Sequence, residues 1–213
     1  IAIRVLSFQK KIIDYSFWKN RLEQAFVLRK AIGLTPSDKN NTFRLVHGEG
    51  DELPGLIIDI YDQTAVIQAH SVGMHVNRQE IADALLDVMS PTIKHIFYKS
   101  ETTLPYKAEL TETIGFLTEP TSDFLAIENG LKFQVDFLKG QKTGFFVDQR
   151  ENRALLEKYA LGRNVLNMFC YTGGFSFYAM RGGANLVHSL DSSAKAIELT
   201  NQNIALNFPN DPR

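Results

Sequence analysis

The sequence lacks the features that disulfide frameworks, zinc sites and membrane spans require. Its 213 residues include one cysteine, Cys170, which cannot form an internal disulfide and is typical of a reducing compartment. The five histidines are scattered without the spacing of zinc ligands. No apolar run approaches the ~18–20 residues needed to cross a bilayer, and no signal-peptide pattern is present. We therefore predict a cytoplasmic protein without a zinc site.

An excess of charge of either sign is also missing. The chain has 23 Lys and Arg against 24 Asp and Glu, which gives a formal net charge of −1. Overall charge therefore gives no argument for nucleic acid, although a local basic face can still bind phosphates. An apolar content of 44% with 22% charged residues is ordinary for a globular protein with a real core, and the length allows one or two domains.

The first 41 residues predict one strand and one long helix. Ile1 to Phe8 alternates apolar and polar residues, which is typical of a strand. Asp14 to Ile32 has apolar residues near helical spacing, with Ser16 as the expected N-cap and Gly33 as the stop. Because the chain starts at an isoleucine, we expect that an N-terminal piece has been removed.

The next segment, residues 42–137, predicts a small α+β domain because short strands surround a single helix. The helix is expected over Val76 to Met89. The last two strands are expected to form a hairpin across Asn129-Gly130. The expected strands are Phe43 to His47, Leu56 to Tyr61, Thr64 to His70, Lys94 to Lys99, Phe124 to Glu128 and Lys132 to Phe137.

After residue 137 the pattern changes to alternating helices and strands, which predicts a parallel α/β sheet. A loop with Gly140 and Gly144 comes first, and the elements that follow are a helix at 149–161, a strand at 165–169, a helix at 175–181, a strand at 186–190 and a helix at 193–207. Only 22 residues follow Asp191, whereas a sheet of this kind needs several more strands. We therefore expect the chain to contain the front of this domain and to lack its back.

A candidate cofactor site lies where the first of these strands meets its helix. Gly173 and Gly174 permit close backbone approach there, because glycine has no Cβ. The helix that follows directs unpaired N–H groups and a partial positive charge at an anionic group. Asp191 follows Gly173 by 18 residues, at the end of the second strand, where an acidic side chain can bind both hydroxyls of a ribose.

The glycine pattern separates two kinds of cofactor. A turn that binds the pyrophosphate of NAD would read G-x-G-x-x-G, but here adjacent glycines are followed by Phe175-Ser176-Phe177. NAD is therefore disfavoured, and S-adenosylmethionine, which has no pyrophosphate and a single carboxylate, suits the turn better. The alternative is a simple tight turn, with Asp191 as the N-cap of the last helix.

Several stretches in order resemble one family. They are Gly48 to Leu56 (GEGDELPGL) with Asp59, Gly140 to Arg153 (GQKTGFFVDQRENR), Val165 to Phe175 (VLNMFCYTGGF) and Gln202 to Asn207 (QNIALN). Together they resemble the S-adenosylmethionine-dependent 23S rRNA cytosine-C5 methyltransferases, which combine a PUA domain, an α+β middle domain and a Rossmann-like catalytic domain. The K-T-G-F-F-x-D-Q-R run joined to Y-T-G-G-F is the most specific part.

The resemblance implies a domain for each segment. Residues 1–8 would be the last strand of a missing PUA-like domain, 9–41 a connecting helix, 42–137 a middle domain that positions RNA, and 138–213 the N-terminal part of the methyltransferase domain. The full protein would then transfer a methyl group from S-adenosylmethionine to carbon 5 of a cytosine in large-subunit rRNA.

The resemblance also implies site residues. The cofactor would lie beside Phe146, Asp148, Gln149, Arg150, Asn167, Phe169, Tyr171, Thr172, Gly173, Gly174, Asp191 and Ser192. RNA would meet Lys139, Lys142, Phe145 and Arg153, with phosphate on the lysines and a base on an aromatic ring. For the two arginines, Arg150 and Arg153, an alternative is an ordinary helix surface paired with Asp148 or Glu157. The lysines could equally be ordinary surface residues, Gln149 a helix cap and the segment 48–55 only a loop.

The catalytic residues of this family do not match anything in the chain. Methylation at carbon 5 of cytosine uses a cysteine thiolate that attacks carbon 6, and the resemblance implies that it lies in a Ser-Cys-Ser segment near an Asp-Pro-Pro segment. Asp211-Pro212-Arg213 does not match. Cys170 is expected to pack as a small hydrophobe. We therefore predict no catalytic residue and expect this chain alone to be inactive.

Two further expectations concern partners and alternatives. An incomplete parallel sheet leaves a strand edge open, so we expect self-association, for example as a homodimer, besides binding to rRNA. Two other functions remain open on the residues alone. One is a non-catalytic RNA-binding or scaffold module, and the other is an NAD-linked oxidoreductase.

Overall fold

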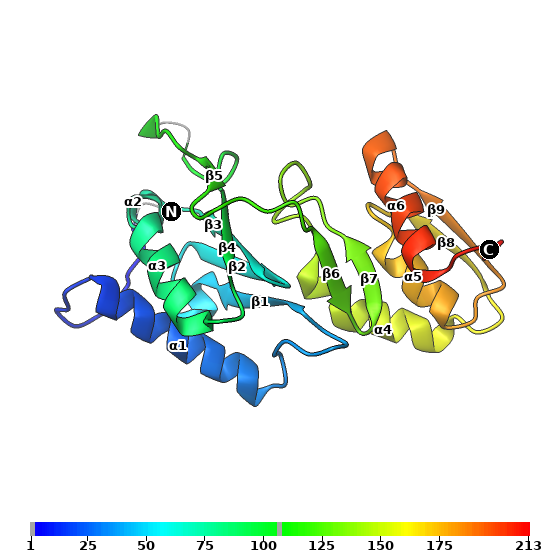
Figure 1. Ribbon diagram of the computed structural model, residues 1–213, viewed down its shortest axis with the longest axis horizontal. Helices are drawn as coiled ribbons and strands as arrows, with labels where there is room; N and C mark the ends of the chain where they lie inside the picture. Colours follow the sequence, from blue (N-terminus) through cyan, green and yellow to red (C-terminus); the bar gives the residue numbers. More distant parts are fainter. Residues whose placement is uncertain (1–2, 106–107) are drawn as a thin grey trace.

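Five strands form the largest sheet of the computed structural model, which describes residues 3–105 and 108–213 (Figure 1). Neighbouring strands are antiparallel except β3 and β4, which are parallel. A parallel pair needs a crossover, which α2 (Val72–Val76) and α3 (Arg78–Met89) supply. The sheet order is β1 (Thr42–His47), β2 (Leu56–Tyr61), β3 (Thr64–Ala69), β4 (His95–Lys99) and β5 (Ile114–Phe116).

The first helix, α1 (Tyr15–Ala31), packs beside α3 and covers this sheet (Figure 1). Trp18 and Leu22 on α1 are each 1% exposed and join the main apolar core with the inner side chains of β1–β4. Burial of this apolar area is the main stabilising term of such a layer. The N-cap is Asp14, whose carboxylate accepts from the Phe17 amide at 3.0 Å, so the expectation of Ser16 was wrong.

A separate hairpin, β6 (Leu125–Glu128) and β7 (Leu131–Gln134), lies between the large sheet and the C-terminal helices (Figure 1). Both turn residues, Asn129 and Gly130, have positive φ, at 49° and 80°. That combination is the signature of a two-residue hairpin turn, and it confirms the predicted hairpin. Phe133 on β7 packs its ring against those of Phe145 and Phe177, at centroid distances of 4.8 and 5.8 Å.

The C-terminal part alternates strands and helices as predicted. Strands β8 (Asn164–Met168) and β9 (Leu186–Leu190) are parallel, and α5 (Gly174–Arg181) is their crossover. Two further helices, α4 (Arg150–Tyr159) and α6 (Ala194–Asn207), complete this part. One face of the strand pair stays open, since Leu166, Met168 and Leu190 are 63%, 50% and 55% exposed. Within the described residues, these strands pair only with each other.

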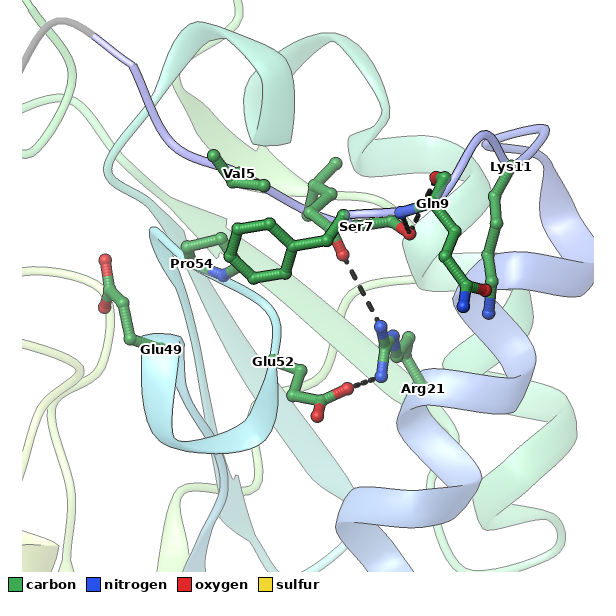
Figure 2. Close-up of a pocket in the computed structure, with 10 residues that line it drawn as sticks. Val5, Ser7, Gln9, Lys11, Arg21, Glu49, Glu52 and Pro54 are labelled. Atoms are coloured by element: carbon green, nitrogen blue, oxygen red, sulfur yellow. Dashed lines mark hydrogen bonds and ion pairs between the residues drawn. The ribbon is translucent and has the colours of Figure 1, made fainter.

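The N-terminal segment differs from the prediction. Residues 3–8 form no strand, and residues 1 and 2 lie outside the described residues. The segment instead crosses the η1 turn (Gly48–Asp51), where Arg4 pairs with Glu49. Beneath the segment, Arg21 of α1 pairs with Glu52 (Figure 2). Arg21 Nη2 also donates to the backbone oxygen of Leu6 at 3.5 Å. Alternation alone did not make a strand, because no neighbouring strand pairs with this segment.

Two smaller differences concern the helices and the edge strand. The helix expected from Val76 breaks at Asn77, so α2 and α3 are distinct, and the Ser71 side chain caps α2 by accepting from the Met74 amide at 3.4 Å. The edge strand β5, three residues long, was not predicted. None of the described helices has the length and apolar composition that a membrane span requires.

Candidate cofactor site

A cavity of 520 Å³ opens where β8 and β9 end. The carboxyl ends of parallel strands are the usual ligand position in sheets of this type. The segment between the hairpin and η3 (Val147–Gln149) closes one side, and we call its residues 140–146 the cavity loop. The lining residues are Gln141, Lys142, Phe145, Phe146, Gln149, Arg153, Phe169, Cys170, Tyr171, Thr172, Gly174, Phe175, Asp191 and Ser192.

A larger cavity, of 620 Å³, lies between the N-terminal segment and the η1 turn (Figure 2). Its charged side chains largely satisfy one another, since Arg21 pairs with Glu52 and Glu49 pairs with Arg4. None of its lining residues belongs to a strand of the described residues. Size and chemistry therefore point to different cavities, and we follow the chemistry to the cavity at the ends of β8 and β9.

The turn after β8 has an unusual backbone. Every second residue has a positive φ: 58° at Phe169, 49° at Tyr171 and 83° at Gly173. Bulky residues rarely adopt this conformation, and such outliers cluster at functional sites. A Cβ on Gly173 would lie 2.5 Å from the Phe177 ring, so only glycine fits. Gly174 begins α5, and the first amides of a helix lack intrahelical acceptors, so they can bind an anion.

Asp191 ties the ends of the two strands together. Its Oδ2 accepts from the Tyr171 amide and its Oδ1 from the Ser193 amide, both at 2.9 Å. A carboxylate has about four acceptor positions, so positions remain for the hydroxyls of a ribose. The N-cap of α6 is Ser193, whose hydroxyl accepts from the Ala196 amide. The alternative in which Asp191 serves only as that N-cap is therefore wrong.

Tyr171 connects this turn to the cavity loop. Its phenol accepts from the Gln141 amide and donates to the Gly144 carbonyl, both at 3.0 Å. Burial raises the pKa of Tyr171 to about 12, so the phenol is protonated and can donate at neutral pH. The Phe146 ring meets the Tyr171 ring edge-on at 5.4 Å, and Lys142 Nζ lies 4.4 Å from the Phe146 centroid.

Four residues predicted to hold the cofactor do not line the cavity. Asp148 and Arg150 line a neighbouring groove with Arg44, on the other side of Gln149. Successive residues of a helical turn point in different directions, and here Gln149 faces the cavity while its two neighbours face the groove. Asn167 donates to Ser176 Oγ at 2.9 Å, and Gly173 lies beneath the turn against Phe177.

The residues predicted to contact RNA divide into two kinds. Lys139 and Lys142 are exposed, and Lys142 lines the cavity. Arg153 and Phe145 are 2% and 3% exposed and lie in the wall of the cavity, so their contact with RNA stays a prediction. Arg153 makes two bonds of 2.8 Å to Glu128. The alternative for Arg150 and Arg153, an ordinary helix surface paired with Asp148 or Glu157, was wrong, because both arginines are buried and pair with Glu128 on β6.

Cys170 lies in the cavity wall and is 6% exposed. Burial and, to a lesser extent, the charge of Asp191 raise the pKa of its thiol. A thiol must lose its proton to act as a nucleophile, so this environment opposes a catalytic role. Gln141 and Phe175 also line the cavity although the sequence analysis did not select them. Both lie in stretches that carry the family resemblance, next to glycines.

The residues present fit S-adenosylmethionine. The first amides of α5 can bind its carboxylate, Asp191 retains acceptor positions for its ribose, and aromatic side chains of the cavity loop and of α5 provide apolar walls for its adenine. Among residues 3–105 and 108–213, no group of three or more His, Cys, Asp or Glu side chains could hold a metal ion.

Known proteins are similar to this chain along its whole length. Ribosomal RNA large subunit methyltransferase I of Alteromonas mediterranea is 40% identical over 100% of this chain and 53% of its own length. The protein of the same name from Tolumonas auensis is 42% identical over 97% of this chain and 52% of its own. The chain therefore spans about half the length of the curated relatives that it matches.

Solved structures agree. A protein from Streptococcus mutans described as a SAM-dependent methyltransferase has a TM-score of 0.81 and 27% identity, over 95% of this chain and 52% of that one. A methyltransferase solved in complex with SAH has the same TM-score and identity. Residues 106–211 match the family model described as S-adenosylmethionine-dependent methyltransferase. Through these residues the chain belongs to the S-adenosylmethionine-dependent methyltransferase family, with the Rossmann-like fold and the cofactor expected from its sequence.

Proposed function

We propose that this chain binds S-adenosylmethionine for methylation of carbon 5 of a cytosine in large-subunit rRNA. One observation carries the proposal: Asp191, the start of α5 and the aromatic residues of the cavity loop surround one cavity at the ends of two parallel strands. The names of the relatives support large-subunit rRNA as the substrate. The choice of carbon 5 rests on the family resemblance of the sequence.

The residues of the chain would bind and orient the methyl donor. S-adenosylmethionine supplies an activated methyl group on a sulfonium. The amide of Gly174 would attract its carboxylate, and Asp191 would accept hydrogen bonds from its ribose. Phe146 and Phe175 would exclude water from the cavity. We assign no catalytic nucleophile.

The two parts of the chain would divide the work. Residues 42–137 would position the RNA, and residues 138–213 would hold the cofactor. Lys139 and Lys142 are exposed on and beside the cavity loop, where they could contact phosphates of an RNA that approaches the methyl donor. Asp148 and Arg150, in the neighbouring groove, would have no direct contact with cofactor.

Titration calorimetry tests the cofactor site. We expect the chain to bind S-adenosylmethionine and not NADH. Asp191→Ala should raise the dissociation constant for S-adenosylmethionine about tenfold or more, because the lost bonds involve a charged acceptor. Asp38→Ala is the matched control, since this exposed aspartate makes the same charge change away from the cavity.

Each other outcome of that titration has a meaning. Binding of NADH in preference to S-adenosylmethionine would support an oxidoreductase. Binding of rRNA fragments with no binding of S-adenosylmethionine would support a non-catalytic RNA-binding module. Either result would overturn the proposed function.

The open face of β8 and β9 supports the expected self-association. Met168 and Leu190 are cross-strand partners in the register of the pair, and Leu166 lies on the same face. Contiguous apolar patches on a surface promote association. The 213-residue chain should therefore show a mass that rises with concentration in light scattering, and Leu166→Glu should reduce this rise. A constant monomer mass at all concentrations would contradict the prediction.

A further inference from the structure

The cavity loop is anchored from two sides. On the side of the turn after β8, the Tyr171 phenol forms hydrogen bonds with the Gln141 amide and the Gly144 carbonyl. On the side of the five-stranded sheet, Lys99 Nζ donates to the Gly140 carbonyl. The loop therefore bridges the sheet and the turn, and its conformation depends on both.

A second contact to the sheet is made by a threonine side chain. Thr143 is 0% exposed, and its hydroxyl donates to Asp59 Oδ2 at 2.6 Å. The Tyr61 phenol lies 2.8 Å from the same hydroxyl and 3.4 Å from the Phe145 carbonyl. Asp59 and Tyr61 both belong to β2, so two side chains of the five-stranded sheet contact the cavity loop directly.

Neutralising Asp59 does not require the threonine. Asp59 is 0% exposed, and Arg44 already pairs with both of its oxygens, at 2.7 and 2.9 Å. The hydrogen bond from Thr143 is therefore not needed to neutralise Asp59. It fixes one residue of the cavity loop against a carboxylate that Arg44 already holds in place. Lys142, next to Thr143, and Phe145, two residues after it, line the cavity.

We infer that Thr143 and Asp59 are positioning residues that hold the cavity loop in place, so that the affinity for the cofactor depends on the five-stranded sheet. The inference rests on the proposed cofactor site. Neither side chain lines the cavity; each acts through the loop that does. Preorganised loops bind more tightly, because less ordering remains to be completed on binding.

Two substitutions of Thr143 test the inference in the whole chain. Thr143→Val keeps the shape and removes the hydroxyl, so we expect the dissociation constant for S-adenosylmethionine to rise about tenfold, as expected for one lost buried hydrogen bond. Thr143→Ser restores the hydroxyl and should stay within about twofold of wild type. Thr64→Val is the control, since Thr64 is a 2% exposed threonine on β3 away from the cavity.

Thermal unfolding of each variant separates positioning from stability. A purely structural role would lower the melting temperature of Thr143→Val and leave its dissociation constant unchanged, and that result would overturn the inference. If Thr143→Val does not fold, Tyr61→Phe removes a second contact to the loop and should also weaken binding. Wild-type protein that binds no S-adenosylmethionine would overturn the proposed function, and the inference with it.

Discussion

Glu128→Gln is expected to destabilise the protein by about 3–5 kcal/mol, the usual effect of removing one partner from a buried ion pair. Glu128 is 0% exposed and accepts from Arg153 at 2.8 Å, from Arg150 at 3.4 Å and from the Tyr178 phenol at 3.0 Å. Two arginines share this one carboxylate. Glutamine keeps the shape of the side chain and leaves both cations without a counter-charge in the interior.

Urea unfolding followed by circular dichroism measures this loss. Glu198→Gln is the matched control, because its ion pair with Lys195 is exposed on both sides and such pairs are worth about 0–1 kcal/mol. Glu128→Gln should also lower the affinity for S-adenosylmethionine. The reason is that Arg153 packs against the cavity wall, with its Cζ 4.6 Å from the centroid of the Phe145 ring. Equal free energies of unfolding for the two variants would show that the ion pairs of Glu128 with Arg150 and Arg153 contribute little to stability.

Gly173→Ala is the second substitution with a large expected effect, about 2–4 kcal/mol of lost stability. Part of the loss is backbone strain, because φ is +83° and a residue with a Cβ pays about 1 kcal/mol there. The rest is overpacking, typically about 1–3 kcal/mol. The new methyl would meet Phe177 at 2.5 Å and Thr200 at 2.9 Å, and both are buried.

Gly162→Ala separates the two contributions. Gly162 has a similar φ of +68°, but nothing lies within 4 Å of an added Cβ. It should therefore cost only the strain of about 1 kcal/mol. The difference between the two variants in urea unfolding gives the packing term. If both variants lose the same free energy of unfolding, the residues around Gly173 can relax, and close packing does not restrict this position.

The elements of the fold were largely predictable, because their signals are local. The hairpin was marked by Asn129-Gly130, and the parallel strands by apolar runs between helices. The prediction of an N-terminal strand was wrong for the opposite reason. Alternation in residues 3–8 indicates a strand only where another strand offers hydrogen bonds, and that information is not local. The short edge strand β5 has too few residues to carry a pattern.

For the candidate site, the sequence predicted the glycine turn and Asp191 as a group, and the structure places Gly174 and Asp191 at one cavity. It did not predict side-chain direction within the D-Q-R run, where one residue lines the cavity and its neighbours face a different groove. Nor could it find the partner of Arg153. Glu128 precedes Arg153 by 25 residues and belongs to a different element, so only the folded chain brings them together.

The position of the hairpin limits how the molecule can be shortened or recombined. Phe133, Glu128 and the arginines of α4 form one interior, which joins the hairpin to the helices that follow it rather than only to the sheet before it. A shortened protein that begins after β7 would leave Arg153 without its counter-charge and Phe177 without a cover. Any exchange of the cofactor-binding part between related proteins should therefore carry the hairpin with it, with the cut placed before Phe124.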